Sequence, residues 1–368
     1  MRQSPIVYFL FFISGITALV YEIVWTRMLT LVFGHTVFSV SIVLAAFMAG
    51  LGLGSYLFGY AIDRLPDSKG SSEGKASTAL LTYGWVEILI FASGALLSLL
   101  FANFAELYAS LHSILPESAA LQNLIKMVLA FALMLIPTTL MGATLPLISK
   151  YCINDDSRIA TQISLLYAIN TLGAALGCLM TGFFLMGTFG VLQTVFLAAG
   201  ANLLIGIGAL SIYIESSPNA SWKFYIPALR VPRIDWNSEQ KFWMGISFIC
   251  GFTALAYEVL WTRLLVFSIA STIYSLSMML TVFLLGIFLG SLLLIPLASR
   301  IHNLRTALLI LQAGTGVYVI GSLYGLESIL SAPWNSYNLT DPASAFLRYF
   351  KDSAGLMLVP TLFLGMCF

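Results

Sequence analysis

The sequence predicts an all-α transmembrane helix bundle, and three observations support this prediction. Hydrophobic residues make up 59% of the chain and charged residues only 9%, where a soluble domain has about 25% charged residues. The mean hydropathy is +0.94 over 368 residues, which is too high for a single soluble core. One fifteen-residue stretch occurs twice, at 15–29 and at 251–265, so the bundle is expected to contain two copies of one unit.

Ten apolar runs are long enough to cross a membrane, and none alternates with a period of two. Because lipid offers no hydrogen bonds to the backbone, only helices or closed barrels cross it, and runs of this kind exclude the barrel. The first run is too long for the apolar part of a signal peptide. The expected spans are about 5–33, 36–62, 78–103, 122–148, 159–187, 190–214, 242–268, 271–299, 304–329 and 352–368.

Lysine and arginine residues fall mainly on one side of these spans. With the N-terminus in the cytoplasm, twelve of the 17 lie inside, three lie outside, and two, Arg27 and Arg263, lie within spans. Cytoplasmic loops of membrane proteins carry such an excess of positive charge. The sequence therefore predicts a multi-pass protein with a cytoplasmic N-terminus, and we expect its membrane to be the bacterial inner (plasma) membrane.

The longest predicted connection, 215–241, carries three prolines and four cations. It is expected to be a cytoplasmic linker between a six-helix repeat, 1–214, and a second membrane repeat, 242–368. Six helices before the linker bring both repeats in from the same side, which makes them parallel. Two more helices follow Gly142 in the first repeat, whereas its counterpart Gly365 lies three residues before the last residue. The second repeat is therefore expected to be incomplete, and the chain to be a fragment of a longer protein.

The doubled stretch places charges inside apolar spans. Ten of its fifteen positions are identical in the two copies, including Glu22 and Arg27 in the first and Glu258 and Arg263 in the second. An ionised side chain in hydrocarbon costs at least about 2.5–3.5 kcal/mol, so each glutamate is expected to face the bundle interior. Pairing across the repeats, Glu22 with Arg263 and Glu258 with Arg27, would form a structural lock. The alternatives are a site for a cationic amine, a proton relay, or pairing with lipid head groups.

Aromatic residues accompany both glutamates at helical spacing. Tyr21 and Tyr257 directly precede them, and Trp25 and Trp261 follow the tyrosines by four residues. An aromatic wall next to a carboxylate suits an ammonium ligand. The tryptophans equally fit a belt of aromatic residues at the outer membrane surface.

Two further polar residues lie within predicted spans. Glu87 is in the third span, where its counterpart in the second repeat is Gln312, and Asn170 is in the fifth. Single polar residues in membrane helices usually bond to a neighbouring helix. A substrate-binding role is the alternative for both Glu87 and Asn170. The complete candidate substrate-binding set is Glu22, Glu258, Glu87, Tyr21, Tyr257 and Asn170, and the candidate lock adds Arg27 and Arg263.

Glycines recur along the second span of each repeat. Gly50, Gly52 and Gly54 in the first repeat, and Gly286 and Gly290 in the second, follow the small-residue spacing that lets membrane helices approach closely. We interpret these stripes as packing surfaces.

Several classes of function are disfavoured by what the sequence lacks. It contains no catalytic constellation, no phosphate-binding loop and no paired cysteine motif, and its four cysteines and three histidines are scattered singly. No metal site and no cofactor are therefore expected. A net charge of +1 gives no basic field for nucleic acid. The expected partners are membrane lipid and a cationic small molecule.

The doubled stretch, the glycine-rich helix after it, and the segment from Pro137-Thr138 to Gly142-Ala-Thr-Leu-Pro146 resemble the membrane part of the fused membrane/spermidine-synthase-like proteins. This resemblance covers almost the whole chain. The six-plus-six plan and Gly59-x-x-x-Asp63-Arg64 are similar, more weakly, to the major facilitator superfamily.

The first resemblance implies a transporter-like membrane module that recognises a polyamine or another cationic amine. Family members often carry a following cytoplasmic domain similar to polyamine aminopropyltransferases, which uses a decarboxylated S-adenosylmethionine donor. None of that domain's motifs occurs in residues 1–368, so aminopropyl transfer is implied only for a longer parent protein. The alternatives are a structural membrane anchor for such a domain, or a transporter of an unrelated solute.

Overall fold

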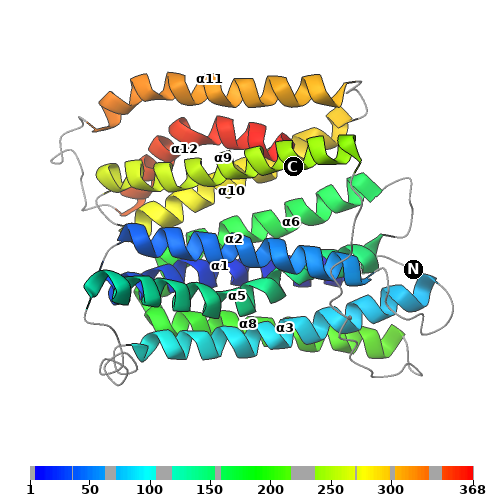
Figure 1. Cartoon of the computed structure of the whole chain (residues 1–368). Coiled ribbons are helices and arrows are strands. Elements are labelled where there is room, and N and C mark those ends of the chain that lie inside the picture. The colour runs from blue at the N-terminus through cyan, green and yellow to red at the C-terminus, as the bar shows by residue number, and fades with distance from the viewer. Residues whose placement is uncertain are drawn as a thin grey trace. The chain divides into compact units, whose positions relative to one another are not determined.

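The structure is a computed structural model that describes residues 5–34, 36–62, 72–104, 118–153, 159–216, 237–269, 272–298, 303–330 and 342–367. Every regular element in these ranges is a helix, and ten helices are long and apolar enough to cross a membrane (Figure 1). The predicted all-α polytopic membrane bundle is thus confirmed, and the chain is a multi-pass membrane protein. Most of the predicted linker 215–241, together with Asp63 and Arg64, lies outside the described residues.

The helices follow the predicted spans closely, and a π-helical turn, η2, interrupts the fifth. Gly34, which follows α1, has a φ of +71° and donates its backbone N–H to the Thr30 carbonyl, a C-terminal cap that suits glycine. The elements are α1 (Pro5–Phe33), α2 (Thr36–Ile62), α3 (Ser72–Ala102), α5 (Ala119–Cys152), α6 (Ile159–Met180), η2 (Thr181–Leu185), α7 (Met186–Phe189), α8 (Val191–Ser216), α9 (Ser238–Ile269), α10 (Thr272–Ala298), α11 (Leu304–Leu330) and α12 (Pro342–Cys367).

The last helix begins ten residues earlier than the sequence predicted. Charged residues between 348 and 352 indicated a connection there, but the helix runs through them from Pro342. Arg348 and Asp352 lie one turn apart and their side chains approach to 3.9 Å, so the two charges pair along the helix surface. The apolar segment suited to a membrane span accordingly starts at Phe346.

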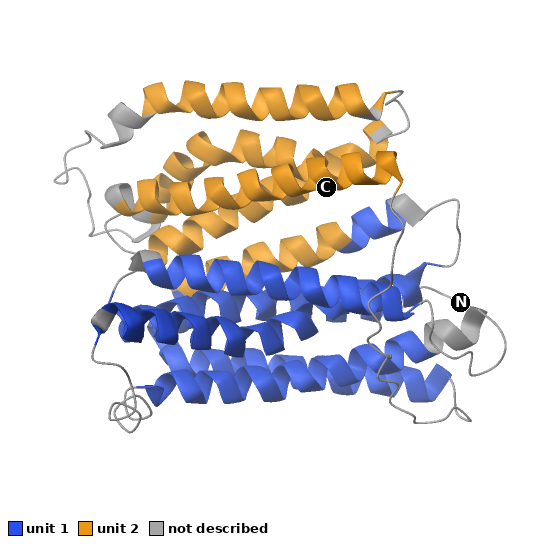
Figure 2. Cartoon of the chain, viewed as in Figure 1, with its two compact units in different colours: residues 1–166, 184–231 blue, residues 167–183, 232–368 orange. Residues whose placement is uncertain are grey.

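The chain forms two compact units (Figure 2). Unit 1 comprises residues 1–166 and 184–231, and unit 2 comprises residues 167–183 and 232–368. The division after residue 231 falls within the predicted linker, whereas residues 167–183, which were expected in the first repeat, pack with unit 2. One such contact is made by Phe183 in η2, whose ring stacks on Tyr274 of α10 at a centroid distance of 5.1 Å.

Unit 1 is a closed ring of five helices. In this ring α1 packs on α2, α2 on α5, α5 on α3, α3 on α8, and α8 on α1 again. The core lies inside the ring and includes large, fully buried side chains such as Trp25, Tyr83 and Phe47. Side chains on the inner faces of α1, α3 and α8 therefore meet one another.

Unit 2 repeats part of this order. Within it, α9 packs on α10, α10 on α12, and α12 on α11, as α1, α2, α5 and α3 do in unit 1. Local geometry repeats as well, because the Trp25 and Phe47 rings lie 6.3 Å apart and their counterparts Trp261 and Phe283 lie 6.4 Å apart. The sequence repeat is therefore also a repeat of packing geometry within each unit.

Glycines bring α2 and α5 into backbone contact. A Cβ atom on Gly50 would overlap the Thr138 side chain, and one on Gly54 would overlap the Thr139 carbonyl oxygen. Ser55 adds a hydrogen bond of 2.9 Å from its hydroxyl to the Gly142 carbonyl. Gly52 points away, with nothing within 4 Å of a Cβ. The packing interpretation is confirmed for Gly50 and Gly54, and Gly52 lies outside the contact.

The same contact joins α10 and α12 in unit 2. A Cβ on Gly286 would overlap the Thr361 side chain, and one on Gly290 would overlap the Leu362 carbonyl oxygen. Ser291 donates its hydroxyl to the Gly365 carbonyl at 3.3 Å. Backbone approach at small residues is thus the shared feature that fixes this pair of helices in each unit.

Substituting Gly54 by alanine is expected to destabilise unit 1 by about 1–3 kcal/mol, because the new methyl group has no room against α5. Thermal unfolding of the detergent-purified protein measures this effect. The matched control is Gly52→Ala on the same helix, which should leave the unfolding temperature unchanged or slightly raised. Equal unfolding temperatures for the two variants would contradict the proposed backbone contact.

Candidate functional site

The two glutamates of the doubled stretch are buried at matching places. Glu22 on α1 is 5% exposed and Glu258 on α9 is 4% exposed, as expected for carboxylates that face a bundle interior. In each copy the threonine four residues later donates its hydroxyl to the glutamate's own backbone carbonyl at 2.8 Å. The two sites are therefore alike in local geometry as well as in sequence.

The arginines of the doubled stretch differ from each other in burial. Arg27 is half-buried in unit 1, whereas Arg263 is exposed in unit 2. The lock predicted from the sequence would pair Glu22 with Arg263 and Glu258 with Arg27, and each pair would join residues of different units. The lock therefore stays a prediction.

The tryptophans lie in the core of their units. Trp25 is 0% exposed and donates its indole N–H to the Ser98 hydroxyl on α3 at 2.8 Å, and Trp261 is 3% exposed. A belt residue would face lipid, so the aromatic-belt interpretation of Trp25 and Trp261 is wrong. The Tyr21 and Trp25 rings lie 4.9 Å apart and are tilted by 32°, and both take part in the packing between α1 and α3.

Tyr21 points toward α3 at Gly94. A Cβ atom on Gly94 would lie only 2.8 Å from the Tyr21 ring and 2.9 Å from its hydroxyl oxygen, so the tyrosine packs closely against this glycine. Gly94 follows Glu87 by seven residues, so both lie on the same face of α3. The sequence grouped Tyr21 with Glu22, whereas the structure directs its hydroxyl to the face of α3 that carries Glu87, about two turns further along.

Glu87 is the centre of a buried polar cluster formed by three helices. Its side chain is 0% exposed. One carboxylate oxygen accepts a hydrogen bond of 2.7 Å from the Ser14 hydroxyl on α1, and the other accepts one of 2.6 Å from the Asn202 amide on α8. Both distances are short, as is usual when an acceptor is a carboxylate.

Two polar atoms next to this carboxylate have no hydrogen-bond partner within the described part of the chain. They are the Tyr83 hydroxyl and the side-chain oxygen of Asn202, on residues that are at most 1% exposed. The Tyr21 hydroxyl, at Gly94 further along α3, also has none. Tyr83 lies one turn before Glu87 on α3, and its hydroxyl is beside the carboxylate without meeting hydrogen-bond geometry. Since buried polar groups are nearly always paired, this cluster has capacity for a further proton, water molecule or cation.

Unit 2 contains a neutral version of the same helix contact. Gln312 is the counterpart of Glu87, and Cys250 is the counterpart of Ser14. The Gln312 amide donates to the Cys250 sulfur at 3.3 Å and to the Cys367 sulfur at 3.5 Å. Both units thus have a polar contact between their first and third helices. In unit 1 this contact contains a carboxylate, and in unit 2 an amide takes its place.

Asn170 does not belong to the unit that contains this cluster. It is half-buried on α6 and belongs to unit 2. Tyr257 is also in unit 2, is half-buried, and stacks on Trp261 at 5.1 Å. Of the six candidate substrate-binding residues, Glu87 and Tyr21 share the packing face between α1 and α3.

Sequence reasoning missed Ser14, Tyr83 and Asn202. Ser14 immediately precedes the repeated stretch, and its counterpart is a cysteine, so the repeat alone gave no signal. Asn202 is an amide in the middle of the apolar run of α8, which is the same signal that singled out Asn170. Tyr83 precedes Glu87 by four residues, a spacing that places both on one helix face.

A separate cavity of about 500 Å³ lies where α1 and α3 end and where α5 and α8 begin. Apolar side chains such as Met28 and Phe101 line it, together with Lys126. It does not include Glu22 or Glu87. Among the described residues, no group of three or more histidine, cysteine or acidic side chains could hold a metal ion.

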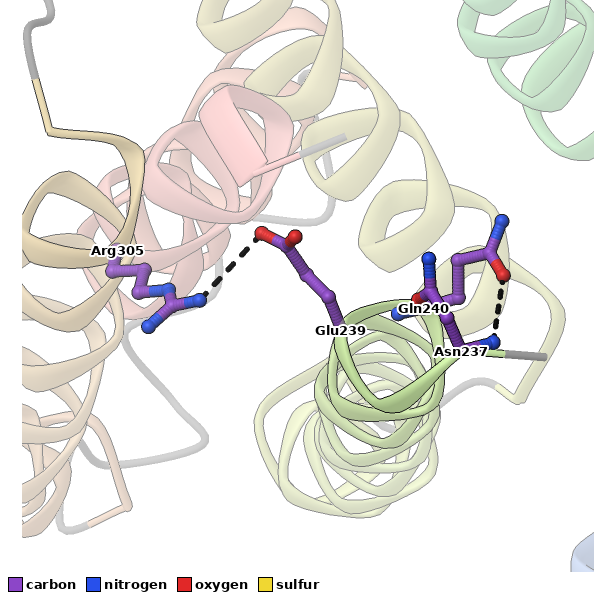
Figure 3. A network of polar contacts seen from close by, with 4 residues as sticks. All are labelled: Asn237, Glu239, Gln240 and Arg305. Atoms are coloured by element: carbon purple, nitrogen blue, oxygen red, sulfur yellow. Dashed lines mark hydrogen bonds and ion pairs between the residues drawn. The ribbon is translucent and has the colours of Figure 1, made fainter.

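An exposed polar network connects the beginnings of α9 and α11 (Figure 3). Asn237 and Gln240 exchange side-chain-to-backbone hydrogen bonds of 2.8 and 3.0 Å, which cap α9. Glu239 pairs with Arg305 at 3.6 Å, and the Arg305 guanidinium lies 5.2 Å from the Phe242 ring centre. The Glu239 and Arg305 side chains are 68% and 60% exposed, so this pair contributes little to stability.

Comparison with protein-family models finds no match to this chain, and comparison with curated proteins finds none either.

Replacing Asn202 by alanine is expected to destabilise unit 1 by about 1–3 kcal/mol, because the buried carboxylate loses a donor. The same replacement made together with Glu87→Gln should cost less, since a neutral amide needs that donor less. Thermal unfolding of the four proteins of this double-mutant cycle measures the difference, with Asn123→Ala on the exposed face of α5 as the control. If Asn202→Ala lowered the free energy of unfolding equally with Glu87 and with Gln at position 87, the stability would not depend on a hydrogen bond between Asn202 and the carboxylate.

Proposed function

We propose that this chain is a transporter-like integral membrane module that recognises a polyamine or another cationic amine through carboxylates buried in its helices. The observation that supports the proposal is the burial of Glu22, Glu87 and Glu258, each at most 5% exposed, within helices suited to cross a membrane. Acidic residues at this depth are costly, and in membrane proteins they usually belong to substrate or ion pathways.

Charge complementarity favours a cation as the ligand. Glu22 and Glu258 occupy matching positions in their own units, so each unit offers one buried carboxylate of this kind to an ammonium group. Each glutamate has a tyrosine as its direct neighbour, at Tyr21 and Tyr257, and tyrosine faces attract ammonium groups. Arg27 and Arg263 would then balance the carboxylates in the absence of a ligand.

The proposal includes the orientation and setting inferred from the sequence. The N-terminus would lie in the cytoplasm, and the membrane would be the bacterial inner membrane. In a longer parent protein, a following cytoplasmic domain similar to aminopropyltransferases would supply the chemistry, and this module would deliver or sense its amine. Residues 1–368 carry no catalytic constellation of their own.

A structural anchor for such a domain is the second candidate function. It is favoured by the packing role of the motif's aromatic residues, since Trp25 hydrogen-bonds Ser98 and Tyr21 packs against Gly94. In that case the glutamates would serve only to hold helices together.

Replacing both Glu22 and Glu258 by glutamine separates the two candidates. The transporter proposal predicts that spermidine uptake into vesicles containing the full chain falls by about tenfold or more, which corresponds to about 1.4 kcal/mol of lost binding free energy. Uptake of labelled spermidine at matched protein levels measures this, and binding to the detergent-purified protein gives a second readout.

Glu239→Gln is the matched control, because it removes an exposed carboxylate from the same chain. Uptake and binding should be unchanged in this variant. Normal uptake in the Glu22/Glu258 double variant would refute the recognition proposal, and a loss of folding in that variant would favour the structural anchor.

A further inference from the structure

The internal repeat indicates that packing at position 87 does not require a carboxylate. Gln312 occupies the corresponding place in unit 2 and makes an amide-to-sulfur contact with Cys250, as Glu87 makes a contact with Ser14. Glutamine has nearly the same shape as a protonated glutamic acid, but it does not exchange a proton with its surroundings. What Glu87 adds to the shared architecture is therefore the ability to bind and release a proton.

The surroundings of Glu87 are suited to holding it in either form. From α1, Ser14 donates to it, and the Tyr21 hydroxyl lies further along at Gly94; from α8, Asn202 donates to it; and on α3, Tyr83 lies beside it. No arginine, lysine or histidine is among these contacts. An ionised carboxylate can accept from the Tyr83 hydroxyl, and a protonated one can donate to the free oxygen of Tyr83 or Asn202.

Glu87 lies deep enough in the membrane for its protonation state to matter. Glu87 lies nine residues into the membrane-suited part of α3, Thr78–Ala102. At 1.5 Å per residue it is therefore about 14 Å from that end of the span, inside the hydrocarbon layer. A carboxylate there without a cationic partner is costly when ionised, so its charge is expected to change with its surroundings.

Glu87 lies closer to the end of unit 1 where α1 and α3 begin. It is nine residues from the beginning of the membrane-suited part of α3, Thr78–Ala102, and fifteen residues from its end. Because α1 and α3 end where α5 begins, the beginning of α1 and the end of α5 share this closer end. Tyr8, near the beginning of α1, is half-buried there, and Cys152, at the end of α5, is buried.

We propose that Glu87 is a proton-exchange site, which takes up one proton from water at the Tyr8 end of unit 1 and returns it by the same or the opposite side. In the step, a proton from a water molecule forms an O–H bond to a Glu87 carboxylate oxygen and leaves hydroxide behind; release reverses the step. The inference deepens the proposed transport function, because it assigns Glu87 to a driving proton and leaves Glu22 and Glu258 to the amine.

Infrared difference spectroscopy of the full chain in lipid vesicles tests the proposal without any amine. Spectra taken between acidic and alkaline buffer should contain a carbonyl band of a neutral carboxylic acid that disappears as the pH rises and shifts in heavy water. Glu87→Gln should lose this band, and Glu239→Gln should retain it. Tyr83→Phe should keep the band but shift its frequency, because the O–H group loses a neighbour, and this shift assigns the band to Glu87. A carboxylic acid with a purely structural role would give a band that does not change with pH.

Identical spectra for the parent protein and Glu87→Gln would overturn the proposal. A response of Glu87 to added sodium ions with no response to pH would overturn it as well, in favour of a metal cation. If Glu87→Gln fails to fold, the band shift in Tyr83→Phe decides the question, since an unshifted band would refute the assignment. Loss of spermidine uptake with an intact Glu87 band would refute the amine proposal alone.

Discussion

Hydrocarbon offers no hydrogen bond to a polar side chain, and the polar contacts of this bundle follow from that constraint. Glu87 obtains its partners from Ser14 and Asn202, on two other helices. Trp25 obtains its partner from Ser98 on α3. Threonines inside the helices donate to carbonyls of their own helix, as Thr138 does to Met134 at 2.7 Å. Each contact removes an unpaired group from the apolar interior, and those of Glu87 and Trp25 also fix one helix against another.

Close packing at glycine makes these contacts possible. In unit 1 the backbones of α2 and α5 meet at Gly50 and Gly54, and in unit 2 those of α10 and α12 meet at Gly286 and Gly290. Once this pair is fixed, the helices packed on either side of it are placed in the same order in both units. The repeat thus conserves packing, while the side chains at the contact between first and third helices differ. The first and third helices meet through Ser14 and Glu87 in unit 1 and through Cys250 and Gln312 in unit 2, so the titratable carboxylate is in unit 1.

Much of the architecture could be predicted from the sequence, because hydrophobic length and the repeat are strong signals. The ten spans and the glycine contacts followed from them. The beginning of α12 did not, because Arg348 and Asp352 pair on the helix surface and their charges resemble a loop in the sequence. The position and length of a membrane-spanning helix depend on the run of apolar residues within it, which a sequence shows directly.

The site could be predicted only in part. Glu22, Glu87 and Glu258 were recognisable as charges in apolar runs, and all three are buried. The partners of Glu87 were not recognisable, because Asn202 is 115 residues away in sequence and meets it only through the closing of the five-helix ring. Nearness in sequence associated Tyr21 with Glu22, but adjacent residues on a helix point in different directions, and Tyr21 faces α3.

The central claim is that the carboxylate of Glu87 serves function, while an amide suffices for packing. A reciprocal exchange tests it most directly: Glu87→Gln and Gln312→Glu are made separately, and thermal unfolding of each purified protein is compared with that of the parent. The account predicts that Glu87→Gln unfolds close to the parent temperature. It predicts that Gln312→Glu is less stable by about 2.5–3.5 kcal/mol, because the new carboxylate would meet the thiols of Cys250 and Cys367. A stable Gln312→Glu together with a collapsed Glu87→Gln would contradict the account.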